Sequence, residues 1–495
     1  MNRIATRRAT ESVPALLLLA AGLSAPLAPA APLGFAAASA QEAKAASAAD
    51  EVARLLAAAA EAQAAEDAAR AEELLRAALD LAPAHVDVHV ALGRHLYVNG
   101  QGAEGLGLLW RAVELDAKHV AAGQMLAEAL LAEADYCVEQ GDAANADASV
   151  ARADEQLARL EPEAAAQAPA FQVLRVRVLM RIDGRGEAAF ARAFTLAKAD
   201  PSDLERHALL VEAAGVGQGF DAALAWYDEG TQPAWQIDWF AAGCLAARAT
   251  WNFNNYVDDD KAFADYVAAE KRMQLAGKLR PEYFDAASER ISYYRSWSGW
   301  IRHRQERLDE AFELFNGAWG RLPLNENAIS GMFWVAGKWY ELGEMEKARE
   351  AYRVLCSLAP QRSEFWNNYG LICRDTGHYE ESFRAYRKAM ELLPDDPRIV
   401  NDCALILQYH LRRDLDQAEL WLIRAEDLAR ANLAGAENDG DDARATEQRL
   451  ILGDALVNLA RLYGEQQKMA EAAEHWNELR ALDATRDELP ENGGR

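Results

Sequence analysis

The sequence predicts an all-α protein, an α-solenoid of about eleven stacked antiparallel helix pairs. Three observations lead to this prediction. Helical patterning of apolar residues begins at Glu51 and continues almost to the end of the 495 residues. Residues 329–396 contain two windows that repeat at a spacing of 34 residues. No stretch alternates polar and apolar residues over a useful length, so strands are not expected.

The two windows, 329–362 and 363–396, share small, aromatic and proline positions. Ala336 corresponds to Gly370, Gly343 to Gly377, Ala348 to Ser382, Tyr352 to Tyr386 and Pro360 to Pro394. With Trp366 and Ala389, the second window resembles the tetratricopeptide repeat (TPR), although Tyr369 and Cys373 depart from its pattern. The resemblance implies a TPR-like right-handed superhelix whose concave wall is made by the first helix of each pair.

The first 40 residues have the pattern of a secretory signal peptide. Arg3, Arg7 and Arg8 form a basic segment, residues 13–23 form a short apolar run, and residues 38–40 form an A-x-A cleavage motif. The run is too short for a comfortable membrane span, although an uncleaved anchor is the alternative. We therefore expect an exported bacterial type of protein, periplasmic or secreted, with no stable membrane span after cleavage.

The formal net charge of −26 restricts the classes of partner. Binding to nucleic acid requires clustered lysine and arginine, and docking on anionic lipid requires the same, so neither is expected. The charge instead favours a basic or neutral partner, or serves only solubility.

The repeats divide the chain into segments. We expect a degenerate TPR array at 41–237 with a loose leader at 41–50, an irregular Trp-rich helical insertion at 238–291, a TPR array with the clearest repeats at 292–431, an acidic loop at 432–446, a TPR-like helix pair at 447–486 and a tail at 487–495. Asp258 is expected to cap a helix of the insertion. The insertion is either a hinge between two arrays or a binding site.

The resemblance implies that a partner contacts set positions on the first helices. We call the following the groove residues: Phe333, Trp334, Tyr340, Asn367, Asn368, Arg374, Arg398 and Asn401. In this family the amide of Asn368 is placed to grip a peptide backbone, because it both donates and accepts; ordinary surface polarity is the alternative. Phe333, Gly337 and Asp402 replace three members of the family's two-carboxylate clamp, so a C-terminal carboxylate is not the expected ligand.

Nine of the thirteen tryptophans lie between Trp226 and Trp339. They either fill space between helices or include an aromatic patch that binds a partner or sugars. The five cysteines are odd in number and form no CxxC. Cys356 and Cys373 fall on neighbouring helices, and whether they form a disulfide stays open.

Recognisable catalytic motifs such as HExxH, GxSxG and the Walker loop are absent from the sequence. The closest histidines, His85, His89 and His95, are expected to be structural rather than metal ligands. We expect no catalytic residue, no metal and no cofactor.

These observations favour a non-catalytic scaffold that binds a peptide or protein in the concave groove, within a cell-envelope complex. The alternative is a glycan- or cell-wall-associated binding module, or an enzyme, that uses the Trp-rich middle region. The sequence does not identify the partner or the oligomeric state.

Overall fold

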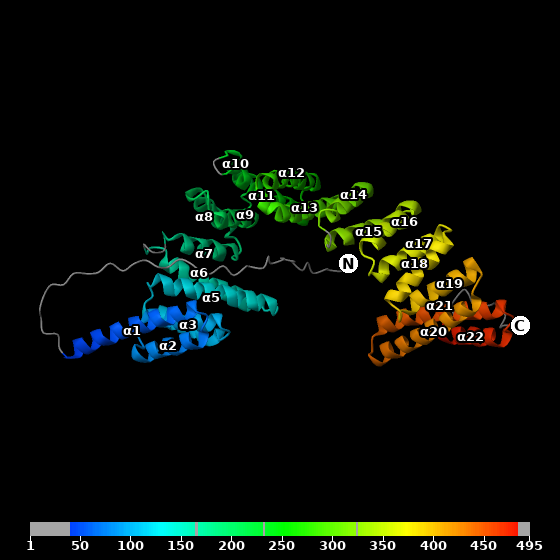
Figure 1. The fold of residues 1–495 in the computed structure, drawn as a ribbon, viewed down its shortest axis with the longest axis horizontal. Helices are drawn as coiled ribbons and strands as arrows, with labels where there is room; N and C mark the ends of the chain where they lie inside the picture. Colours follow the sequence, from blue (N-terminus) through cyan, green and yellow to red (C-terminus); the bar gives the residue numbers. More distant parts are fainter. Residues whose placement is uncertain (1–39, 164–166, 231–232, 323–324, 484–495) are drawn as a thin grey trace. The chain divides into compact units, whose positions relative to one another are not determined.

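The computed structural model describes residues 40–163, 167–230, 233–322 and 325–483 (Figure 1). In these ranges the chain forms 22 α-helices, a 3₁₀ turn and a π turn, and no β-strand. The predicted all-α fold of stacked helix pairs is confirmed. The predicted signal peptide, except for Ala40, and the predicted tail at 487–495 lie outside the described residues.

The contacts within the chain define two compact units, Met1–Ala117 and Lys118–Arg495. The described part of the first unit contains α1 (Ala40–Ala64), α2 (Ala68–Leu81), α3 (Val86–Val98) and α4 (Gly102–Leu115). Ala59, Leu75, Leu92 and Leu96 form a core cluster between these helices. Residues 41–50, expected to be a loose leader, instead lie within α1.

The second unit begins with α5 (Val120–Glu139), α6 (Ala143–Leu160), α7 (Pro169–Met180), α8 (Gly186–Ala199), α9 (Leu204–Gly217), α10 (Phe220–Asp228), α11 (Ala234–Asn254), α12 (Asp259–Leu279), a 3₁₀ turn (Pro281–Tyr283), α13 (Phe284–Arg304) and α14 (Leu308–Trp319). It continues with α15 (Glu326–Glu341), α16 (Met345–Leu358), α17 (Ser363–Asp375), α18 (Tyr379–Leu392), α19 (Pro397–Leu405), a π turn (Ile406–Leu411), α20 (Leu415–Asn438), α21 (Asp442–Glu465) and α22 (Met469–Leu482). Consecutive helices pack against each other as pairs.

Glycine and aspartate set the ends of several helices. Gly343 follows α15 with φ +79° and Gly377 follows α17 with φ +78°, a backbone conformation that favours glycine. Asp258 accepts a hydrogen bond from the Lys261 amide at 2.8 Å, so the predicted cap of α12 is confirmed. The Asp396 carboxylate caps α19 in the same way.

The predicted irregular helical insertion at 238–291 is built on a long, well-packed helix pair, α11 and α12. Helices α11 and α12 have 21 residues each. They share a core with α13 that includes Ala249, Tyr266 and Met273. Arg248 donates to both oxygens of Asp265 at 2.8 and 2.7 Å, which fastens α11 to α12. The division into units falls between Ala117 and Lys118, not in this insertion.

The predicted acidic loop at 432–446 is wrong, because α20 and α21 extend through most of it. Only residues 439–441 separate the two helices, and Gly440 makes the turn with φ +69°. Ala436 and Ala445 are buried where the helices pack. This apolar seam favours helix despite the acidic residues on the outer faces.

The repeat at 397–431 also departs from a regular pair. The π turn Ile406–Leu411 follows α19 directly, and Arg412 and Asp414 then take left-handed backbone conformations before α20 begins. π turns insert one extra residue into a helical turn and are often found next to functional sites.

Candidate partner-binding surface

The aromatic groove residues lie on α15. Trp334 is 61% exposed, while its neighbour Phe333 is partly buried. The Phe333 ring packs against Phe365 of α17 and Tyr352 of α16, with centroids 5.5 and 5.9 Å apart. Phe333 is therefore fixed by the fold, and Trp334 is the aromatic group that remains available to a partner.

A polar bridge joins α15 to α17. The Tyr340 hydroxyl donates to Oδ2 of Asp375 at 2.9 Å, and Nε of Arg374 donates to Oδ1 at 2.9 Å. The hydrogen bond to Asp375 raises the pKa of Tyr340. Both oxygens of Asp375 are thus engaged within the protein, and Arg374 is partly neutralised before any ligand arrives.

The two neighbouring amides on α17 differ in their contacts. Nδ2 of Asn368 lies 3.5 Å from the Tyr352 hydroxyl, which is a long hydrogen bond. Oδ1 of Asn367 is buried and has no hydrogen-bond partner in the part of the chain that the structure describes. An unpaired buried acceptor costs free energy, and this oxygen has almost no surface that a partner could reach.

The groove residues on α19 are used within the fold. Asn401 is buried and accepts a hydrogen bond from Nδ2 of Asn458 on α21 at 2.9 Å. Asn458 also accepts from the Tyr409 hydroxyl at 3.2 Å. Arg398 is exposed and pairs with Glu447 of α21. Asn401 thus holds α19 to α21 and has little capacity left for a ligand.

Asp402, next along α19, is half-buried. Burial raises its pKa to about 6; the charge of Arg374 opposes this shift and that of Asp454 adds to it. The Tyr386 ring packs against Cys403 and Ile406 and lies over Gly370 of α17. Its buried hydroxyl has no hydrogen-bond partner among the described residues.

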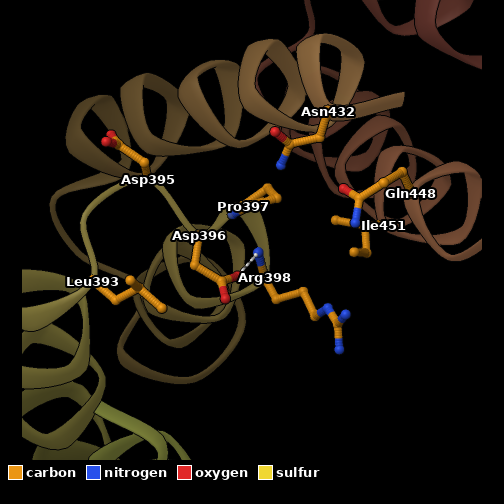
Figure 2. Close-up of a pocket in the computed structure, with 8 residues that line it drawn as sticks. All are labelled: Leu393, Asp395, Asp396, Pro397, Arg398, Asn432, Gln448 and Ile451. Atoms are coloured by element: carbon orange, nitrogen blue, oxygen red, sulfur yellow. Dashed lines mark hydrogen bonds between the residues drawn. The ribbon is translucent and has the colours of Figure 1, made fainter. Parts of the chain in front are cut away.

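A cavity of about 250 Å³ lies beside Arg398, where the α18–α19 turn meets α20 and α21 (Figure 2). We call it the corner pocket. Its lining combines apolar and polar side chains: Leu393, Asp395, Asp396, Pro397, Arg398, Asn432, Gln448 and Ile451. Figure 2 shows the amides of Asn432 and Gln448 turned toward the space between the lining residues.

The Trp-rich region is mostly packing. Of its nine tryptophans only Trp334 is exposed, and Trp226 and Trp339 are buried. The Trp297 ring packs edge-to-face against Phe253 at 5.6 Å, and Arg280 covers the Trp235 ring at 5.0 Å. Ring faces that are already covered are less open to a sugar or a peptide.

The remaining candidates have structural contacts. Cys356 and Cys373 are free, buried thiols, and burial raises the pKa of each to about 12. Nδ1 of His89 lies 3.0 Å from the His85 carbonyl, and Nδ1 of His95 lies 3.2 Å from Nε2 of Gln63. No group of three potential metal ligands occurs among the residues that were described.

The glycines at 100, 102 and 105 have the GxGxxG spacing of dinucleotide sites. Gly100 lies in the turn after α3, and Gly102 and Gly105 lie in the first turn of α4, whereas the nucleotide motif follows a strand. Gly100 makes the turn with φ +87°, and a Cβ on Gly105 would lie 2.6 Å from the Gly93 carbonyl oxygen. Helix packing explains these glycines.

Comparison with known proteins assigns the most regular repeat. Residues 363–396 match the tetratricopeptide repeat family. That segment is a tetratricopeptide repeat. Repeats of this fold generally serve as protein–protein interaction scaffolds. The match covers α17 and α18, which carry Asn367, Asn368 and Arg374.

Longer proteins share similarity over part of the chain. The protein O-mannosyl-transferase TMTC1 of Homo sapiens is 28% identical over 144 residues, which is 29% of this chain and 16% of that protein. The Mus musculus protein is 26% identical over 144 residues, or 29% of this chain and 15% of its own length. The matched segment thus spans less than a fifth of either relative.

Solved structures resemble the chain only loosely. The C-terminal part of a TPR repeat-containing protein from Cytophaga hutchinsonii covers 56% of this chain and 96% of its own, with 12% identity and a TM-score of 0.35. The alignment with a chain of the APC/C hetero-tetramer Cut9–Hcn1 covers 88% of this chain and 94% of that one, with 12% identity and a TM-score of 0.30. Such low scores support no inference about function.

Proposed function

We propose that the chain is a non-catalytic scaffold that binds a peptide or protein segment along the first helices α15, α17 and α19. The observation that carries this proposal is the exposure of Trp334 on α15, beside a ring that the core holds in place. Exposed aromatic side chains next to rigid neighbours are common anchors of protein interfaces.

The test is a pull-down from a cell-envelope extract with the wild-type chain and matched variants. Trp334→Ala with Asn368→Ala removes the anchor and a groove amide. Leu342→Ala is the control, because Leu342 is also 61% exposed but follows α15 in the turn. We expect specific proteins to be retained by the wild type and the control and lost by the double variant. Equal retention by all three contradicts groove binding.

The competing function is glycan binding through the Trp-rich middle region. It would be supported by polysaccharide retention that is lost on Trp297→Ala, and such a result would displace protein binding as the main role. Similarity to the mannosyl-transferases does not favour this alternative, because it covers at most 16% of those proteins. We therefore propose no transferase activity for this chain.

The place of action is proposed from the sequence of the first 40 residues. An exported protein with a cleaved signal would begin at or near Gln41 when isolated from its natural source. Mass spectrometry of the intact protein measures this, and a chain that retains Met1 contradicts cleavage. None of the described helices is both long enough and apolar enough to cross a membrane.

A further inference from the structure

The corner pocket contains a buried acceptor that the fold leaves unused. Gln448 of α21 is only 8% exposed, and its Oε1 has no hydrogen-bond partner in the described ranges. Its amide is turned into the cavity (Figure 2). Because a buried acceptor without a partner costs free energy, a ligand that brings a donor to this oxygen gains an advantage.

The charges around the cavity also favour a donor. The guanidinium of Arg398 is paired with Glu447 and the backbone amide of Arg398 donates to Oδ1 of Asp396 at 2.9 Å. Oδ1 of Asp395 lies 3.2 Å from Nη2 of Arg424, and the Asp395 side chain is 79% exposed. The lining and its pairing partners therefore contain three carboxylates and two guanidinium groups, a net charge of −1. A cation is attracted and an anion is repelled.

The walls are suited to an aliphatic stem. Pro397 and Ile451 are buried, and Leu393 is 44% exposed. Lysine and arginine place apolar methylene groups against such walls while the charged head reaches polar groups. The volume of about 250 Å³ is below the roughly 300–1,000 Å³ of sites for drug-sized ligands, so it suits one side chain.

We infer that the corner pocket receives one lysine or arginine side chain of the bound protein partner. Its head donates to Oε1 of Gln448, and its methylene groups contact Pro397 and Ile451. This inference rests on the proposed function, and it specifies the chemistry of the partner. A basic segment in the partner also agrees with the net charge of −26 on this chain, because opposite charges favour association.

The experiment uses the full chain and a library of acetylated, amidated nonapeptides randomised at every position. Peptides captured by the immobilised protein are sequenced, and the frequency of each residue is compared with that of the input. The pocket variant is Asp395→Asn with Gln448→Met, which removes one charge and the acceptor while keeping side-chain size. The matched control is Asp416→Asn with Gln417→Met, on exposed positions of α20. These lie about 22 Å along the helix from Asn432 at 1.5 Å per residue.

We expect lysine or arginine to be enriched at one position of the captured peptides. The enrichment should fall about tenfold in the pocket variant, the factor expected for one charge-assisted hydrogen bond, and stay unchanged in the control. Peptides captured without basic enrichment, or with enrichment that the pocket variant keeps, overturn the inference but leave groove binding intact. Failure to capture any peptide counts against both. If free arginine at millimolar concentration displaces the captured peptides completely, the pocket serves a small molecule and the inference is wrong.

Discussion

Replacing Asp402 by asparagine should stabilise the protein at neutral pH and leave its stability nearly unchanged near pH 4. The carboxyl group is half-buried on α19. Burial raises its pKa from 3.8 to about 6, against the favourable charge of Arg374 and with the unfavourable charge of Asp454. The folded protein therefore binds this proton more tightly than the unfolded chain.

The sign of the pH dependence follows from proton binding. Between about pH 4 and 6 the folded state holds more protons at this site than the unfolded state, so the free energy of unfolding falls as pH rises. At about 1.4 kcal/mol per pKa unit, the rise in the pKa of Asp402 from 3.8 to about 6 lowers the free energy of unfolding by about 3 kcal/mol above pH 6. Asparagine is never ionised, so Asp402→Asn should remove this loss.

The assay is urea-induced unfolding followed by circular dichroism at pH 4 and pH 7.5, for the wild type, Asp402→Asn and the exposed control Asp416→Asn. The Asp402 variant should gain about 2–3 kcal/mol over the wild type at pH 7.5 and almost nothing at pH 4. The control should stay within about 0.5 kcal/mol of the wild type at both values. An equal effect at both pH values, or a loss of stability at pH 7.5, refutes the reasoning.

Two glycine substitutions test how closely the helices pack, and one histidine substitution tests an ion pair. Gly370→Ala should destabilise the fold by about 1–3 kcal/mol, since its Cβ would lie 2.9 Å from the Tyr386 ring; Gly435→Ala meets no atom within 4 Å and should raise the melting temperature instead. The hydrogen bond to Glu426 raises the pKa of His475 above 6.5. The wild type should therefore have a higher free energy of unfolding than His475→Gln below pH 6. This difference should disappear as pH rises through the pKa of His475 in the folded protein. A difference that does not vary with pH would exclude the ionised pair as its cause.

The fold follows from local patterns, which is why the sequence predicts it well. Small residues such as Gly370 and large ones such as Tyr386 recur at a spacing of 34 and describe how one helix meets the next. The acidic segment 432–446 has the composition of a loop, but its alanines at 436 and 445 are buried between two helices. A helical seam needs only small residues at the right spacing.

The contacts of the binding surface depend on pairs that are distant in sequence. Asn401 bonds to Asn458, and Arg398 pairs with Glu447, across separations of 57 and 49 residues. Neither partner lies in the regular repeat, so no motif indicates that these groove residues are occupied. Gln448, the unpaired acceptor of the corner pocket, likewise has no sequence signal, because its burial depends on how α20 and α21 pack.

The π turn at Ile406–Leu411 has a consequence for how this part of the protein can vary. One extra residue in a regular α-helix would advance every later side chain by about 100°, whereas a π turn absorbs that residue by widening a single turn. Gln408 and Tyr409 of this turn contact Asn458 of α21 at 3.3 and 3.2 Å. The length of the turn therefore decides which side chains face α21, so insertions and deletions should be tolerated less well here than in the turns at Gly343 and Gly377.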